Sequence, residues 1–195
     1  MASAARSEWD TTAKARLDEL EQVHVAAHGT NRGRRWGTDQ LNRSMFLTLS
    51  AQFQTYCRDL HDEAVEVHVT NANARQEAVL RKLLTQGRKL DVGNPRTDAL
   101  ENDFSRLGFK LLPALRAKGV LTVKRLEQLD VLIDFRNLIS HGQETSIQAY
   151  VASEDIAATL GSYRRHRSSL TGLVGTMDRV VSAELKSGLQ IPAPW

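Results

Sequence analysis

The residues best suited to chemistry lie in one short segment, Asp134-Phe-Arg-Asn-Leu-Ile-Ser-His-Gly142. Arg136 is a permanent cation that can grip phosphate through a planar fork of donors. His141 carries an imidazole that can take up or release a proton near neutral pH, and Asn137 adds an amide that can orient either group. A cation, an amide and a titratable ring at one place are suited to act on a phosphodiester.

The apolar pattern around this segment predicts a helix that ends at Gly142, a natural left-handed residue after a helix. At about 100° per residue, Arg136 falls inside the apolar arc, at roughly −20° from Leu129. A cation there must be paired, reach out of the core, or lie in a cleft or a subunit interface. Asn137 and His141 are four residues apart and therefore neighbours on one helix face.

A purely structural reading explains the same residues. The dipole at the end of the helix would favour a protonated His141, and Arg136 would pair with a nearby aspartate. With 26 Lys and Arg, mostly Arg, and 6 His in 195 residues, an Arg and a His at this spacing are expected roughly once by chance. Spacing alone therefore does not identify a catalytic site.

Two basic patches could follow an RNA backbone, because an aromatic ring among cations can stack on a base. They are Arg32, Arg34 and Arg35 beside Trp36, and Arg164, Arg165 and Arg167 beside Tyr163 and His166.

Two histidine clusters have spacings that could suit a metal, namely Glu21, His24 and His28, and His61-Asp-Glu63 with Glu66 and His68. Both are interpreted as solvated helix surface, so no metal site and no cofactor are expected. Cys57 is interpreted as a packing residue.

Apolar residues recur at helical spacing along almost the whole chain, which predicts an all-α, up-and-down bundle of four or five principal helices. Residues 1–195 are expected to form a single domain with a short Pro-containing tail at 188–195. The expected helices are 8–28, a long one from 38 or 39, 73–90, short pieces at 98–107 and 113–118, one from 122 through the segment above, and about thirty residues from Ser153. Residues 143–152 are expected to be a loop, with 146–151 extended.

Composition indicates a protein that is neither secreted nor inserted in a membrane. The net charge is only +3, the chain has one cysteine, and it has no signal-peptide pattern and no apolar run that could span a bilayer. A cytoplasmic location is the simplest expectation.

Phe135-Arg-Asn-Leu-Ile-Ser-His-Gly142 resembles the signature of the HEPN superfamily, the higher-eukaryote and prokaryote nucleotide-binding domains. In these helical bundles an Arg, commonly followed by a polar residue, precedes a His by this spacing near the end of a late helix. Residues 41–57 also resemble the long early helix of such domains. The corresponding site residues here are Arg136, Asn137 and His141.

The resemblance implies a metal-independent endoribonuclease, a toxin or an effector of antiviral defence. It would act on an RNA substrate as a homodimer whose two motifs form a composite site. An antitoxin or a nucleotidyltransferase is a possible partner in such systems. The alternative is a non-catalytic helical module that binds a nucleotide, RNA or a partner protein and uses Arg136 structurally.

Overall fold

All regular structure in the computed structural model is helical within the described residues, which are 1–28, 36–70 and 72–195. The elements are α1 (Ala4–Glu8), a π-helical turn η1 (Trp9–Ala13), α2 (Lys14–His28), α3 (Trp36–Val69), α4 (Ala74–Thr85), α5 (Lys89–Val92), α6 (Thr97–Phe104), a 3₁₀ turn η2 (Ser105–Leu107), α7 (Leu111–Arg116), α8 (Val120–Ser140), α9 (Glu144–Ser153) and α10 (Leu160–Leu189). The all-α expectation is confirmed. None of the described helices is long and apolar enough to cross a membrane.

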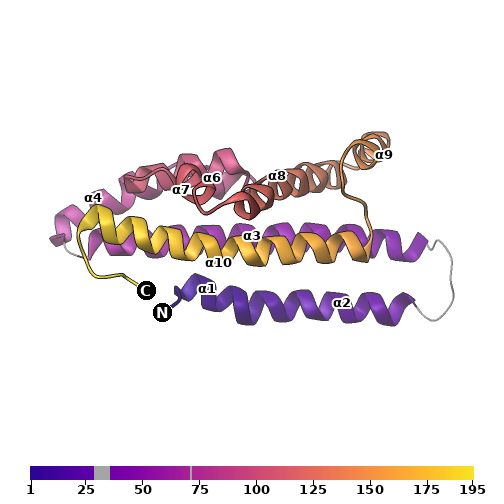
Figure 1. Cartoon of the computed structure of the whole chain (residues 1–195), viewed down its shortest axis with the longest axis horizontal. Helices are drawn as coiled ribbons and strands as arrows, with labels where there is room; N and C mark the ends of the chain where they lie inside the picture. Colours follow the sequence, from indigo (N-terminus) through magenta and orange to yellow (C-terminus); the bar gives the residue numbers. More distant parts are fainter. Residues whose placement is uncertain (29–35, 71) are drawn as a thin grey trace.

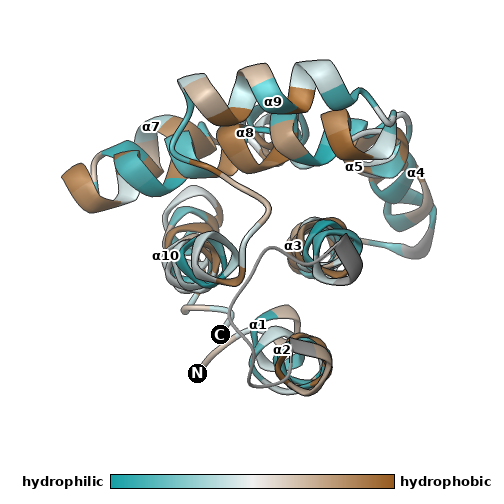
Figure 2. Ribbon diagram, turned by 90° about the vertical axis from the view of Figure 1, so that its right-hand side faces the viewer, coloured by the Kyte–Doolittle hydropathy of each residue, from teal (hydrophilic) through white to brown (hydrophobic). Residues whose placement is uncertain are grey.

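Three long helical stretches lie lengthwise beside one another: α1–α2, α3 and α10 (Figure 1). The helices from α4 to α9 cover α3 and α10 on the side away from α2 (Figure 2). α2 and α3 run in opposite directions, whereas α3 and α10 run in the same direction, because the helices between them carry the chain back along the molecule. The layer that contains α8 therefore packs on two parallel helices, α3 and α10.

The core forms where α3, α8 and α10 meet. Phe46 of α3 makes edge-to-face contacts with Phe135 of α8 and Tyr163 of α10, with ring centroids 5.1 and 5.9 Å apart. Along α3 apolar residues recur at steps of three and four and are buried, with only the last of them partly exposed: Met45, Leu49, Phe53, Tyr56, Leu60, Ala64 and Val67. Phe135 fixes the rotation of α8 and therefore the direction of its neighbour Arg136.

Several helix boundaries differ from those expected. The first helix begins at Ala4, because the side chain of Ser3 caps it by accepting from the backbone N–H of Arg6 at 2.9 Å. The predicted 73–90 helix is two helices, α4 and α5, because the chain turns at Gly87 with φ of +70°. The last helix begins at Leu160, where Thr159 is the cap, and not at Ser153.

The expected loop at 143–152 is wrong, because this stretch is the helix α9. Ile147, Tyr150 and Val151 follow helical spacing and pack against the core. The Tyr150 ring stacks on Phe135 at 6.5 Å, and its hydroxyl donates to the carbonyl of Val131 at 3.3 Å. Burial raises the pKa of Tyr150 to about 12, so this donor stays protonated.

Both ends of the described chain are bound to the same turn of α10. The Asp178 carboxylate accepts from the backbone and the hydroxyl of Ser3, and the Asp178 carbonyl accepts from the indole of Trp195 at 3.2 Å. Ser182 donates to the Trp195 carbonyl at 3.0 Å. The Pro-containing tail therefore folds back on the long helix.

Candidate functional site

The C-terminal end of α8 is closed by a complete Schellman motif. His141 is the C-cap, and Gly142 follows in the left-handed conformation with φ of +62°. The N–H of Gly142 donates to the carbonyl of Ile139 at 3.1 Å, and the N–H of Gln143 donates to that of Leu138 at 3.2 Å. The predicted helix end is confirmed, and the position of the His141 backbone is fixed.

Arg136 is half-buried beside Phe135, as its place on the apolar arc predicts. Its guanidinium Nη1 donates to Oδ1 of Asn137 at 3.3 Å. Within residues 1–28, 36–70 and 72–195 no carboxylate forms an ion pair with Arg136. The purely structural reading, in which Arg136 pairs with a nearby aspartate, is therefore not what the chain adopts.

Asn137 belongs to a row of three acceptors on the polar face of α8, and residues 94–97 supply a donor to each. Asn94 Nδ2 donates to Asn137 Oδ1 at 2.7 Å, and Arg96 forms an ion pair with Asp134. Thr97 donates to Asp130 from its backbone at 3.0 Å and from its hydroxyl at 2.7 Å. We call this set the 94–97 ladder.

The contacts of the 94–97 ladder were not predicted from the sequence. The residues Asn94-Pro-Arg-Thr97 indicate only that a helix ends before them. A usable signal is the spacing of Asp130, Asp134 and Asn137, which puts three acceptors on one helix face and demands donors opposite. Asn94 thereby adds an amide to the candidate site, because it holds the oxygen that also accepts from Arg136.

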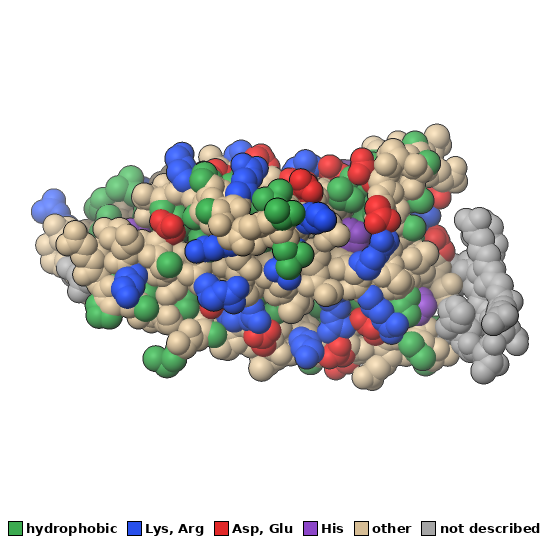
Figure 3. All heavy atoms as spheres, viewed as in Figure 1, with side chains coloured by type: hydrophobic (Ala, Val, Ile, Leu, Met, Phe, Trp, Pro, Cys, Tyr) green, Lys and Arg blue, Asp and Glu red, His purple; other side chains and the backbone are tan. Residues whose placement is uncertain are grey.

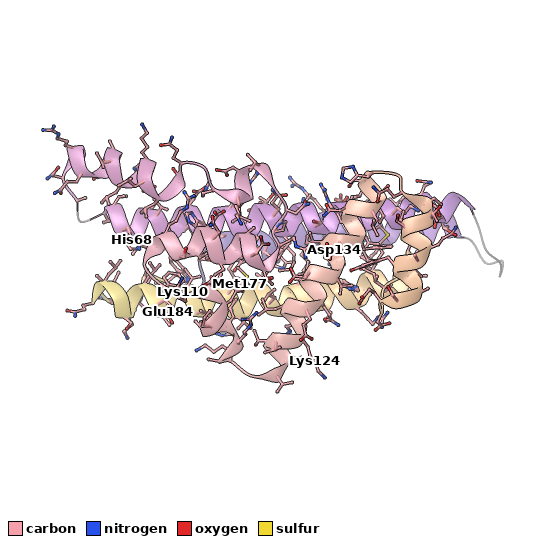
Figure 4. All side chains as sticks on the ribbon, turned by 90° about the horizontal axis from the view of Figure 1, so that it is seen from above. His68, Lys110, Lys124, Asp134, Met177 and Glu184 are labelled. Carbon is pink, nitrogen blue, oxygen red and sulfur yellow. The ribbon has the colours of Figure 1, made fainter. Side chains whose placement is uncertain are left out.

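His141 is exposed at the end of α8, where its backbone N–H donates to the Asn137 carbonyl at 3.1 Å. The side-chain oxygen of Asn137 is engaged by Asn94 and Arg136. Arg136 and His141 are five residues apart, which corresponds to a rise of roughly 7.5 Å along the helix. Seen from above, α8 crosses the long helices obliquely, with Lys124 on the side of α10 and Asp134 over α3 (Figure 4).

The second basic patch is only partly as expected. Arg164 and Arg165 are exposed, but Tyr163 is fully buried in the core, so the prediction that it could stack on a base is wrong. Arg167 turns away to α2, where it pairs with Asp18 at 2.6 Å and Glu21 at 2.7 Å. The first patch, Arg32, Arg34 and Arg35 with the side chain of Trp36, lies outside the described residues.

The histidine cluster in α3 is solvated surface only in part, because Asp62 and Glu66 are exposed but His61 is not, which corrects the sequence interpretation. His61 is fully buried, with Nε2 donating to the carbonyl of Asp103 at 3.1 Å and Nδ1 accepting from Arg88 Nη1 at 3.1 Å. His24 is buried as well. Among the described residues, no three His, Cys, Asp or Glu side chains are gathered closely enough to hold a metal ion. Cys57 is fully buried among apolar residues, so its packing role is confirmed.

No protein-family model, curated protein sequence or solved structure matches this chain. The HEPN resemblance therefore stays a prediction from the sequence.

Proposed function

We propose that this protein is an endoribonuclease, acting as a toxin or in antiviral defence, with Arg136, Asn137 and His141 at its active site. The observation that carries the proposal is the environment of Arg136. Its half-buried guanidinium donates to an uncharged amide, and it forms no ion pair with a carboxylate of the described chain. Such a cation attracts an anion. The exposed imidazole of His141 lies about one and a half turns further along the same helix.

The chemistry follows from these residue types. The 2′-OH of a ribose attacks the adjacent phosphorus, a neutral imidazole takes the 2′-OH proton, and a protonated imidazole gives a proton to the departing 5′ oxygen. Arg136 neutralises the charge that develops on the phosphorane oxygens. The products are a 2′,3′-cyclic phosphate and a 5′-OH end, and no step requires a metal.

A homodimer completes the proposal, because each chain supplies one His141 while cleavage uses both a proton acceptor and a proton donor. Two copies related by a twofold axis would place two imidazoles and two guanidinium groups around one phosphate. The position of Arg136, on the core side of α8 yet accessible, fits an interface between copies.

Cleavage of a mixed RNA pool in EDTA tests the proposal directly. The wild type should produce fragments with cyclic phosphate ends, and Arg136→Ala and His141→Ala should each lose at least about a hundredfold in rate. Arg116→Ala, which removes an exposed arginine of α7, is the matched control and should cut like the wild type.

The nuclease proposal fails if the wild type leaves RNA intact, or if both motif variants cut as fast as Arg116→Ala. RNA binding without cleavage by the wild type would instead support the helical binding module. Growth arrest on expression, relieved by His141→Ala, is the corresponding measurement in cells.

A further inference from the structure

A groove of about 470 Å³ lies between the first half of α8 and the first half of α10, and the charged side chains of its lining are all basic. The lining residues are Leu121, Arg125, Gln128, Arg164, Arg165, Ser168 and Ser169. Three of these seven are arginines and none is a carboxylate. On the face shown in Figure 3, basic side chains gather over α10 beside a group of apolar ones.

The arginines of this groove are weakly neutralised. Arg125 donates to the carbonyl of Gly172 at 3.3 Å and forms no ion pair within the described chain. Arg165 pairs with Asp155, whose side chain is 86% exposed, so solvent and salt screen this pair strongly. Arg164 shares Glu21 with Arg167. The lining therefore has an excess of positive charge that a bound anion can neutralise.

Ser169 supplies an independent sign of a ligand. It is buried at 8% exposure, and its hydroxyl has no hydrogen-bond partner. A buried polar group without a partner costs free energy, and most such groups are satisfied in folded proteins. An anion bound between the arginines would accept a hydrogen bond from this hydroxyl.

The fold also places Arg125 against α10. A Cβ at Gly172 would lie 2.3 Å from the guanidinium carbon of Arg125, so a side chain there would displace the arginine from the helix. Gly172 thus keeps one cation against the wall of the groove. Leu121, an apolar side chain that is 61% exposed, forms part of the rim and can contact an organic group attached to the anion.

We propose that this groove binds the phosphate of an organic phosphate ester, through Arg125, Arg165 and the Ser169 hydroxyl. The phosphate could be an internal diester of an RNA strand or the terminal group of a free phosphate ester. The groove shares no residue with the 134–142 segment. Its phosphate binding therefore goes beyond the nuclease proposal and can be tested whether or not the protein cleaves RNA.

Calorimetric titration at fixed ionic strength tests the groove, using the full chain with His141→Ala so that RNA stays intact. The probes are pyrophosphate, a short oligoribonucleotide with a 5′-OH, and the same strand with a 5′-phosphate. Arg125→Gln should weaken binding at least about tenfold. Gly172→Ala should also weaken binding, because the added Cβ displaces Arg125. This variant should not unfold α10, since alanine favours a helix more than glycine does. Ser169→Ala should weaken binding by a smaller factor.

Arg179→Gln is the matched control, since Arg179 is an exposed arginine of α10 outside the groove lining. It should bind like the parent. A loss with Arg125→Gln that is seen with the 5′-OH strand identifies an internal diester as the ligand, and a loss confined to pyrophosphate and the 5′-phosphate strand identifies a terminal phosphate. The proposal is overturned if no probe binds, or if Arg179→Gln weakens binding as much as Arg125→Gln does.

Discussion

Arg136 differs from most of the other partly buried arginines in what it contacts, although Arg106 and Arg125 also donate only to backbone carbonyls. Arg43, Arg88, Arg96 and Arg167 each meet at least one carboxylate. Arg136 meets only the amide oxygen of Asn137. Because a neutral partner offsets little of the cost of desolvating a guanidinium, the most favourable occupant of the space beside Arg136 is an anion.

Asn94 should act as a positioning residue for this site. Asn94→Ala removes the donor that holds Asn137 Oδ1, so the amide can turn away from Arg136. We expect the rate of RNA cleavage at saturating substrate to fall on the order of tenfold, with a smaller change in KM. Steady-state kinetics and a melting curve check this.

The Asn94 prediction is contradicted if the rate stays at the wild-type level. It is also contradicted if the loss of rate is fully explained by unfolding at the assay temperature. Ser105→Ala, which removes an exposed hydroxyl that donates to a local carbonyl on the same layer, is a matched control and should leave the rate unchanged.

His61 should make stability depend on pH. Burial lowers the pKa of His61 below its ordinary value of 6.5, and the charge of Arg88 lowers it further, against the raising effect of the Asp103 carbonyl. The unfolded chain therefore binds the proton more readily than the folded chain. Stability is full above the ordinary pKa and decreases as the pH falls below it.

Urea denaturation at about pH 7.5 and about pH 5.5 measures this effect. The midpoint should be lower at the acidic pH. His61→Gln, whose amide can still donate to Asp103 and accept from Arg88, should show a smaller decrease than the wild type. Equal decreases in the two proteins would show that His61 is not responsible. The buried His166, whose pKa is also lowered chiefly by burial, would then be the next residue to replace.

At the scale of helices, the Schellman motif makes Gly142 a specific requirement. Gly142→Ala would put a Cβ on a residue with φ of +62°, which should destabilise the protein by roughly 1–2 kcal/mol. Gly188→Ala, in the last turn of α10 with no atom near the added Cβ, should instead stabilise it by about 0.5–1 kcal/mol. Chemical denaturation of both variants measures the change in the free energy of unfolding. Equal changes in the two variants would contradict a specific requirement for glycine at position 142.

Much of the fold could be predicted from helical periodicity, and the errors have physical causes. The long apolar face of α3 and the end of α8 at Gly142 are local patterns, so the sequence shows them directly. α9 was missed because its β-branched residues Thr145, Ile147 and Val151 favour strands in isolation, whereas packing of Ile147 and Tyr150 against α8 decides for a helix.

The candidate site was predictable in part for the same reason. Arg136, Asn137 and His141 lie in one helix, so their relative positions follow from helix geometry. Asn94 and Arg125 depend on how separate helices are brought together, and nothing local indicates their contacts. The full burial of Tyr163 was not predicted, because apolar spacing along a helix does not show how completely neighbouring helices cover each residue.

For the whole molecule, the proposed homodimer gives activity a dependence on concentration. Specific activity should be constant at high protein concentration and should fall on dilution, over the range where sedimentation shows dimers dissociating. A monomer with full specific activity at every dilution would contradict the composite site. A covalently tethered pair of chains is the control, because it should keep its specific activity on dilution.

The 94–97 ladder also limits how this sequence can change over evolution. Each of its three acceptors on α8 is paired with one residue of the segment opposite, so a change on one side removes a hydrogen bond or an ion pair between the two segments. In related chains we expect positions 94 and 137, 96 and 134, and 97 and 130 to vary as pairs. Independent drift at these positions would show that the ladder is incidental, while paired change would mark it as inherited with the motif.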